Sequence, residues 1–349
     1  MSVQFTDVVK RYGTTTAVSS VSFTVETGTL VTLLGPSGCG KTTTLRMIAG
    51  LELPSAGRIE IAGRDVTHLS ATQRDVSMVF QSYALFPHMS VLENVAYGLR
   101  RSSVGREEAT QRAREGLATV GLTGFDARQP SELSGGQQQR VAVARALVLK
   151  PSVLLFDEPL SNLDARLRRQ MREEIRELQR RLGLTVVYVT HDQQEAMAVS
   201  DRIIVMNAGR IEQQGSPREL YEKPATPFLA RFMGESNPAR GIVRRIDAAR
   251  VRVRLGDIEI EVADSAAPEG EATVAVRPEA IAVETAPGPA GALAGTIAKT
   301  SYLGTHMEYS IDTAAGTLFA TCPRVERPLP PGTAVALVLA PRGVIVVRD

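Results

Sequence analysis

The sequence is poor in cysteine, in net charge and in long apolar runs, and each shortage narrows the class of protein. Its two cysteines, Cys39 and Cys322, make no disulfide framework, which favours a reducing cytoplasm. The 40 basic and 38 acidic residues leave a formal charge of +2, so there is no bulk electrostatic case for binding nucleic acid or an anionic membrane. No uncharged run reaches about 18 residues, and the N-terminus has no basic segment before an apolar one. We therefore expect neither a membrane-spanning helix nor a secretory signal.

An apolar, β-branched run at residues 31–34 leads into a glycine-rich turn and a helix start. Gly35, four further residues and Gly40-Lys41-Thr42 satisfy the phosphate-loop pattern G-x-x-x-x-G-K-[ST]. In that pattern backbone N–H groups surround a polyphosphate, the lysine reaches the β- and γ-phosphates, and the hydroxyl binds Mg²⁺. The alternative is a glycine turn beside a lysine, but the strand before it and the helix after it favour a nucleoside triphosphate. The residues expected to contact the nucleotide here are Gly35, Pro36, Ser37, Gly38, Cys39, Gly40, Lys41, Thr42 and Thr43.

Carboxylates and a histidine follow two buried-type strands. The run at residues 152–156 ends on Asp157 and Glu158, and two acids at the exit of a buried strand need a cation or a protein partner. We expect Asp157 to hold Mg²⁺ through water and Glu158 to polarise the water that attacks the γ-phosphate. The run at residues 185–190 ends on His191. A neutral imidazole there could hydrogen-bond the γ-phosphate, or it could be a structural histidine.

Two further polar segments are candidate ligand sites. Gln81 ends a strand-like run at residues 76–80, where an amide points toward the ligand crevice of a parallel sheet and can contact Mg²⁺ or the attacking water. An ordinary strand-end glutamine is the alternative. Leu133-Ser134-Gly135-Gly136-Gln137 opens a helix with a serine cap and two glycines that leave backbone N–H groups uncovered. This segment predicts a second anion site, and a cap without a ligand is the alternative.

In this order and spacing the motifs resemble the ATP-binding subunit of ABC transporters, over about residues 3–235. The resemblance implies that Tyr12 stacks on adenine, where the residues alone also allow plain packing, and that Asp164 belongs to the nucleotide site.

The same resemblance implies a composite site. Two subunits would pack head to tail, so that Ser134 and Gly136 of one close over the γ-phosphate held by Lys41 of the other. Gly135 and Gln137 complete that segment. Spacing alone indicates only two anion sites.

The C-terminal part changes to short alternating strands punctuated by Pro and Gly, which is typical of a small β-barrel. Residues 276–281 and 302–305 resemble the oligonucleotide-fold-like regulatory domain of importers of sugars, polyamines, ferric iron and phosphonates. The expected fold is α/β: a P-loop NTPase with a RecA-like core, an antiparallel β subdomain and a helical insert at about 85–150, then an all-β OB-like barrel. The expected domains are residues 1–235 and 236–349.

The resemblance implies an ATPase, with ATP and Mg²⁺ as cofactors, that energises solute import. It would act as a homodimer with two membrane-spanning permease subunits, and indirectly with a solute-binding protein, on the cytoplasmic face of a bacterial inner membrane. Residues 300–309 look more like the ferric-iron, phosphonate and polyamine branch, so ferric iron ranks first. A sugar importer stays open, as does a soluble ATPase acting on nucleic acid or ribosomes. The latter usually fuses two cassettes, whereas the phosphate-loop pattern occurs once here.

Overall fold

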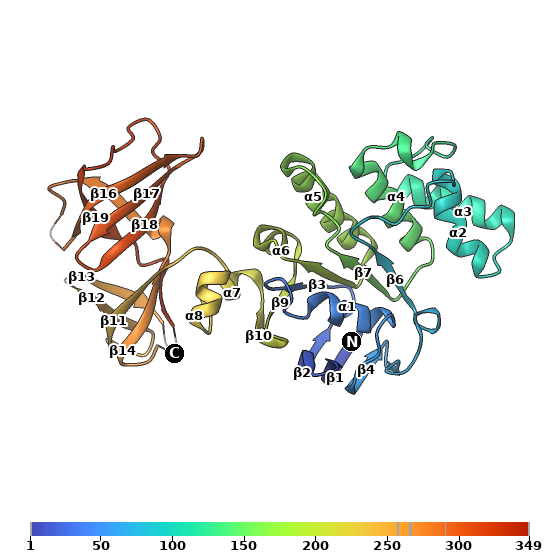
Figure 1. Ribbon diagram of the computed structural model, residues 1–349, viewed down its shortest axis with the longest axis horizontal. Coiled ribbons are helices and arrows are strands. Elements are labelled where there is room, and N and C mark those ends of the chain that lie inside the picture. The colour runs from blue at the N-terminus through green and yellow to red at the C-terminus, as the bar shows by residue number, and fades with distance from the viewer. Residues whose placement is uncertain (1, 257, 265–266, 290, 348–349) are drawn as a thin grey trace. The chain divides into compact units, whose positions relative to one another are not determined.

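The chain folds into two compact units, Met1–Pro217 and Arg218–Asp349 (Figure 1). The computed structural model describes residues 2–256, 258–264, 267–289 and 291–347. Each unit has its own hydrophobic core. Among the helices of the described ranges, none is both long and apolar enough to cross a membrane.

The first unit is built on a six-stranded sheet of order β10-β9-β3-β8-β7-β6. Every neighbouring pair is parallel except β10 with β9. Because both faces of a parallel sheet are covered, its central strands read as continuous apolar runs, and β3 and β8 are buried along their whole length. The strands are β3 Leu30–Leu34, β6 Val76–Val79, β7 Val153–Asp157, β8 Val186–Thr190, β9 Arg202–Asn207 and β10 Arg210–Gly215.

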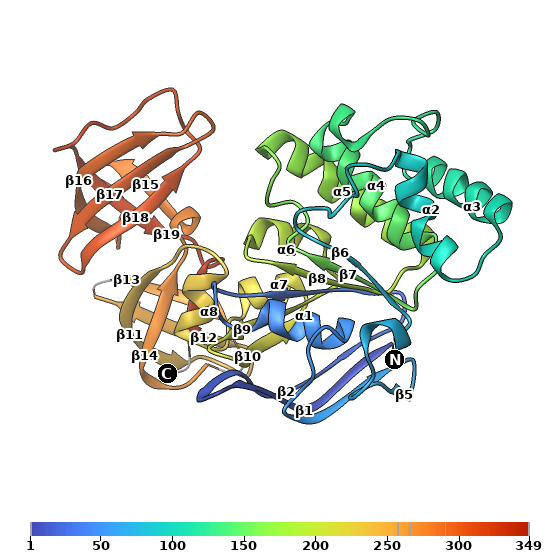
Figure 2. The ribbon, with the colours of Figure 1, turned by 45° about the vertical axis from the view of Figure 1, so that its right-hand side comes forward.

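An antiparallel sheet of order β2-β1-β4-β5 covers the helix α1, Lys41–Ala49. Figure 2 shows α1 between the two sheets, and one core contains apolar side chains from both sheets and from α1. A turn at Gly13 joins β1 to β2. The strands are β1 Val3–Tyr12, β2 Thr15–Val25, β4 Ala56–Ile61 and β5 Arg64–Asp65.

The helical insert follows β6 and carries no strand within its described residues, as expected. Its helices α2, α3 and α4 pack on one another, and α4 also contacts β6. They are α2 Val91–Arg101, α3 Arg106–Thr119 and α4 Gly135–Leu147, and the core is completed by α5 Ala165–Leu182 and α6 Gln193–Val199. Short 3₁₀ helices lie at Ala71–Gln73 and Pro130–Glu132.

The second unit contains two five-stranded sheets of orders β13-β12-β11-β14-β20 and β15-β19-β16-β17-β18. Every strand pairing in them is antiparallel. Alternate side chains of both sheets meet in one core, which agrees with the predicted all-β barrel. The elements are α7 Pro217–Glu222, α8 Pro227–Phe232, β11 Asn237–Arg245, β12 Arg250–Leu255, β13 Ile258–Ala263, β14 Gly270–Val276, a 3₁₀ helix Pro278–Ala280, β15 Ile281–Thr285, β16 Leu293–Tyr302, β17 Met307–Thr313, β18 Gly316–Cys322, β19 Ala334–Leu339 and β20 Val344–Val347.

The boundary between the compact units lies earlier than the expected boundary after residue 235. The strands do begin at Asn237, but the preceding helices group with them. The reason is Arg277, which is fully buried and donates hydrogen bonds to the carbonyl oxygens of Tyr221 at 3.0 Å and Ala230 at 2.6 Å. Its guanidinium also lies 4.3 Å from the centre of the Tyr221 ring. Because a buried guanidinium needs such partners, α7 and α8 are tied to the β unit.

Candidate active site

The phosphate loop connects the carboxyl end of β3 to the first residue of α1. Gly40 precedes the helix with φ +104°, and a Cβ there would lie 2.6 Å from the carbonyl oxygen of Ala17. A Cβ at Gly35 would lie 2.2 Å from the carbonyl oxygen of Met206. Glycine is therefore required at both positions. Gly40 makes no side-chain capping bond, which leaves the N–H groups of the first turn of α1 for an anion.

Lys41 is the fixed positive charge of this loop. Its side chain is 5% exposed, and its Nζ donates to the carbonyl oxygens of Gly35 at 2.7 Å and Pro36 at 2.9 Å. Both acceptors are neutral carbonyl oxygens, so neither of them neutralises the ammonium. The Sγ of Cys39 lies 3.8 Å from the same Nζ.

Asp157 and Thr42 bring a carboxylate and a hydroxyl together beside this loop. Burial raises the pKa of the half-buried Asp157 carboxyl and the charge of Glu158 raises it further, while Arg46 and a hydrogen bond with Thr42 oppose the shift. A partly desolvated carboxylate gains from a nearby cation, and hydroxyl and carboxylate oxygens are ligands that Mg²⁺ accepts. These residues therefore fit a magnesium ion next to the nucleotide.

Glu158 and His191 meet at the ends of neighbouring strands. The Nδ1 of His191 lies 3.1 Å from the Oε2 of Glu158. Glu158 has a left-handed backbone with φ +44°, and its N–H donates to the carbonyl oxygen of Val189 at 3.1 Å, which holds this strained residue in place. Both residues were predicted from the strand ends, and β7 and β8 bring them into contact.

The sequence suggested that Gln81 ends a strand, but in the structure it lies beyond the strand end. β6 ends at Val79, and Gln81 lies exposed in the following turn, which continues through left-handed residues at Tyr83 and Ala84. The Nδ2 of Asn162 donates to the carbonyl oxygen of Gln81 at 3.1 Å. The backbone of Gln81 is thus tied to the loop after Glu158, while its side chain faces solvent.

The loop at residues 161–164 is held close to the carboxylates. The hydroxyl of Ser161 donates to the carbonyl oxygen of Glu158 at 3.1 Å. Asp164 caps α5, because its Oδ1 accepts from the N–H of Leu167 at 2.9 Å. The structure therefore gives Asp164 a helix-capping contact, and its place in a nucleotide site stays a prediction.

Ser134 caps α4 as expected. Its hydroxyl accepts from the N–H of Gln137 at 3.4 Å, and the Gln137 side chain accepts from the N–H of Ser134 at 3.0 Å. A Cβ at Gly136 would lie 3.0 Å from the side chain of Leu167 on α5. Within the described part of the chain, no hydrogen bond joins residues 134–137 to the phosphate loop. One chain therefore brings together the strand-end residues but not the second anion segment.

Tyr12 lies at the end of β1, and its side chain is exposed. The ammonium of Lys10 lies 4.8 Å from the centre of its ring. An exposed aromatic face remains compatible with the predicted stacking on adenine.

Two residues near this site were missed. The positive charge of Arg46, on α1, lowers the pKa of Asp157. Arg46 lies one turn after Thr42, and this i, i+4 spacing could have revealed its place beside the site. Glu195 is buried in the first turn of α6, four residues after His191.

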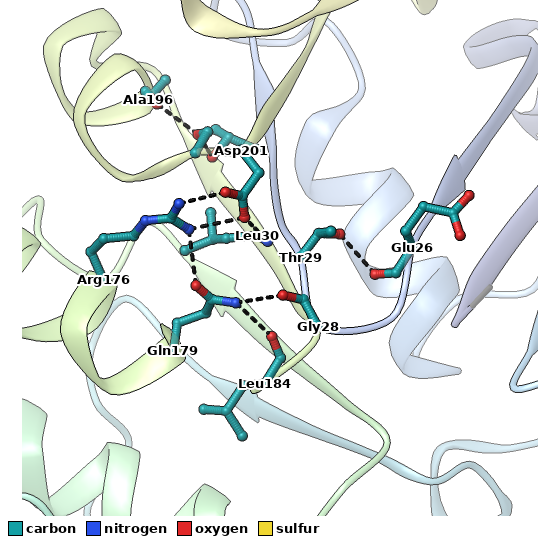
Figure 3. A network of polar contacts seen from close by, with 11 residues as sticks. Glu26, Gly28, Thr29, Leu30, Arg176, Gln179, Leu184, Ala196 and Asp201 are labelled. Carbon is teal, nitrogen blue, oxygen red and sulfur yellow. Dashed lines mark hydrogen bonds and ion pairs between the residues drawn. The ribbon is translucent and has the colours of Figure 1, made fainter. Parts of the chain in front are cut away.

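A polar network secures β3 at the end remote from the phosphate loop (Figure 3). Arg176 makes a two-fold ion pair with Asp201, and Asp201 accepts from the N–H of Leu30 at 2.8 Å. The Nε2 of Gln179 donates to the carbonyl oxygens of Gly28 and Leu184, each at 2.9 Å. The hydrogen bond from Arg176 holds the pKa of Asp201 below its usual value. The network thus fixes α5 to the strand that carries the loop.

Known families match both units. The profile described as ABC transporter matches residues 18–161, and the TOBE domain profile matches residues 274–347. The chain is 61% identical over 347 residues to "Fe(3+) ions import ATP-binding protein FbpC 1" of Rhizobium meliloti (strain 1021), with 99% of this chain and 98% of that protein covered. It is 58% identical over 348 residues to "Fe(3+) ions import ATP-binding protein FbpC" of Brucella abortus (strain 2308), covering 100% of this chain and 98% of that protein.

Solved structures resemble the first unit. A dimeric post-hydrolysis state of the ATP-binding cassette MJ0796 bound to ADP and Pi is 34% identical, has a TM-score of 0.54, and covers 61% of this chain and 98% of its own. CbiO1 from Clostridium perfringens, part of the transporter complex cbiONQ, is 29% identical with a TM-score of 0.58, covering 62% of this chain and 89% of its own.

Proposed function

The chain belongs to the ATP-binding subunits of ABC transporters, and we propose that it energises the import of ferric iron through separate membrane-spanning subunits. The single observation that carries the choice of cargo is the 61% identity, over nearly the whole of both chains, to a protein named for Fe(3+) import. The match therefore extends through the C-terminal unit. Residues 300–309 of that unit favoured the ferric-iron, phosphonate and polyamine branch of importers.

The proposed chemistry uses the residues at the carboxyl edge of the parallel sheet. The loop N–H groups and Lys41 bind the phosphates, since Lys41 is held there by neutral carbonyls. Thr42 and Asp157 would hold Mg²⁺, which neutralises phosphate charge when bound. Glu158 accepts the proton of the attacking water.

His191 has an orienting part in this scheme. In this scheme Nδ1 donates to Glu158, which leaves Nε2 as the ring nitrogen for a ligand. In the neutral tautomer Nε2 is an acceptor and suits the attacking water, and only the imidazolium would donate to a phosphate oxygen. Gln81, with its side chain in solvent beside the Asn162 contact, is proposed to approach the metal and the water once nucleotide is bound.

The complete site is proposed to need two subunits. Residues 134–137 contact α5 of their own chain, and α4 packs on α2, α3 and β6, whereas α1 packs on β2, β6, β7 and β8. A head-to-tail homodimer would bring Ser134 and Gly136 of one subunit to the γ-phosphate bound at Lys41 of its partner. The similarity to a dimeric cassette supports this arrangement. Tyr12 would stack on the adenine, and Asp164 would lie at the same interface.

The remaining partners follow from the proposed import. Two permease subunits would carry the ions, a solute-binding protein would deliver them, and the chain would lie peripherally on the cytoplasmic face of the bacterial inner membrane. No nucleic acid is required.

The cargo is tested by uptake of radioactive solutes into a strain that lacks this chain, complemented with the natural sequence or with Glu158→Gln. We expect ferric iron uptake to be restored by the natural sequence alone, with no change in phosphonate, polyamine or sugar uptake. Restoration of one of the other three solutes in place of iron would overturn the assignment. The Glu158→Gln strain controls for the presence of an inactive subunit.

A further inference from the structure

A buried carboxyl lies directly behind the histidine of the site. Glu195 stands in the first turn of α6 and is 3% exposed, although a carboxylate in an apolar interior is costly. Its N–H donates to the Oδ1 of Asp192, the residue that caps α6, at 3.0 Å. The cap would be complete without a carboxyl at position 195, so the side chain has another task.

Both oxygens of Glu195 are hydrogen-bonded to β8. The hydroxyl of Tyr188 donates to Oε1 at 2.7 Å, and the hydroxyl of Thr190 donates to Oε2. The Thr190 oxygen in turn accepts from the N–H of Asp192 at 3.0 Å. Thr190 therefore bridges the buried carboxyl to the peptide bond between His191 and Asp192.

Two hydroxyls of β8 and two charged groups, Asp192 at the cap of α6 and Arg168 on α5, act on Glu195. Burial raises the pKa of Glu195, the bonds from Thr190 and Tyr188 lower it, Asp192 raises it and Arg168 on α5 lowers it. Arg168 also lies 3.6 Å from the carboxylate of Asp192. Both carboxyl oxygens of Glu195 therefore have hydrogen-bond partners, and the side chain braces the segment from Tyr188 to Asp192.

His191 needs such a brace because its own side chain is poorly held. The imidazole is 58% exposed, and its polar contact within the described residues is the 3.1 Å approach to Glu158. An exposed ring takes its position from its backbone, and the backbone on both sides of His191 is fixed by Thr190.

We propose that Thr190 and Glu195 are positioning residues that hold His191 against Glu158 for ATP hydrolysis. The inference rests on the proposed role of His191 in that reaction. Thr190 and Glu195 touch neither nucleotide nor water in this scheme and act through the peptide bond at His191.

The test compares two substitutions at Thr190 in the full chain. Thr190→Val keeps the shape and removes the bridging hydroxyl, whereas Thr190→Ser keeps the hydroxyl and removes a buried methyl group. We expect Thr190→Val to lower kcat for ATP about tenfold or more, since small misplacements of a reacting group can cost up to about 10²-fold. The KM for ATP should stay unchanged. Thr190→Ser should retain most of kcat, although the loss of the buried methyl group should lower its melting temperature.

A double-mutant cycle with His191→Ala separates positioning from general destabilisation. In the His191→Ala background, Thr190→Val should give no further loss of kcat. An equal loss in both backgrounds would overturn the inference, as would a Thr190→Ser rate as low as that of Thr190→Val. If His191→Ala itself keeps the natural rate, the role of His191 in the proposed function fails first, and this inference fails with it.

A further control is Tyr188→Phe, which removes the other partner of Glu195 and leaves the Thr190 bridge intact. We expect a lower melting temperature with kcat retained. A fall in kcat equal to that of Thr190→Val would show that any loss in this buried cluster slows the reaction, and would contradict a specific bridge to His191.

Discussion

At the scale of single residues, the charge of Lys41 is the feature on which phosphate binding depends. It is nearly buried and held by two carbonyl oxygens. Residues 35–43 contain no second charged side chain that could replace it. We predict that Lys41→Ala weakens nucleotide binding and lowers ATP turnover about 10²-fold or more. Lys150→Ala, at an exposed lysine outside the site, is the control. A Lys41→Ala rate above about a tenth of the natural rate would reject the phosphate-loop assignment.

Gln139 is a residue whose side chain has no visible reason to be polar. It is fully buried in α4, and within the described chain neither its Oε1 nor its Nε2 has a hydrogen-bond partner. Replacing an unsatisfied buried amide by an apolar group removes a desolvation penalty, so Gln139→Leu should stabilise the protein by about 1 kcal/mol. Urea unfolding monitored by circular dichroism measures this. A lower midpoint would instead mean that the amide is hydrogen-bonded to a buried water molecule.

At the scale of elements, the Asp201 network holds α5 to β3 through charge (Figure 3). The pKa of Asp201 is lowered by Arg176 from its usual 3.8, so its stabilisation is present above that value and is lost as pH falls through the lower folded pKa. We predict that Asp201→Asn lowers the melting temperature near pH 7 and that the difference shrinks below about pH 4. Glu173→Gln, in an exposed pair with Arg169, should change little. If the difference in melting temperature between the natural protein and Asp201→Asn did not change with pH, the ion pair between Arg176 and Asp201 would not be its cause.

Local patterns predicted the elements that carry chemistry better than they predicted the contacts between elements. The run into Gly35, the acids after β7 and His191 after β8 were all identified, because buried strands and glycine turns are local signals. The contact between Glu158 and His191 was not, since it depends on β7 and β8 being neighbours in the sheet.

Other strands were not predicted, because most of them form by pairing with segments that are distant in the sequence. β9 is a short apolar run that pairs with β3, and β10, whose one apolar residue is Ile211, becomes a strand by pairing with β9. β15 pairs with β19, which is distant in the sequence. Arg277 was noticed only as part of a family motif, and its carbonyl partners on α7 and α8 have no local signature. Because these partners have no local signal, the sequence pattern puts the boundary just before the first strand of the β unit, whereas the compact units divide after Pro217.

At the scale of the whole molecule, the two compact units predict separable tasks. The phosphate loop, Asp157, Glu158 and His191 all lie before residue 217. We predict that a fragment of residues 1–217 is soluble and binds ATP, as measured by equilibrium binding of a fluorescent nucleotide. Full-length protein with Lys41→Ala is the control for binding outside the site. A folded fragment that fails to bind ATP would show that the second unit completes the nucleotide site.

The central claim is that Glu158 is the base of a composite site shared by two subunits. Glu158→Gln keeps the shape of the side chain, so phosphate and metal binding should persist while the water loses its proton acceptor. The loss of a negative charge beside the γ-phosphate should also reduce repulsion between the two halves of the site.

The most direct measurement is size-exclusion chromatography of Glu158→Gln with Mg²⁺ and ATP, together with its rate of hydrolysis. We predict an ATP-dependent dimer that does not dissociate, with turnover reduced about 10²-fold or more. If excess Mg²⁺ instead restores the rate and no trapped dimer elutes, Glu158 only orders the metal, and His191 is the main catalytic group.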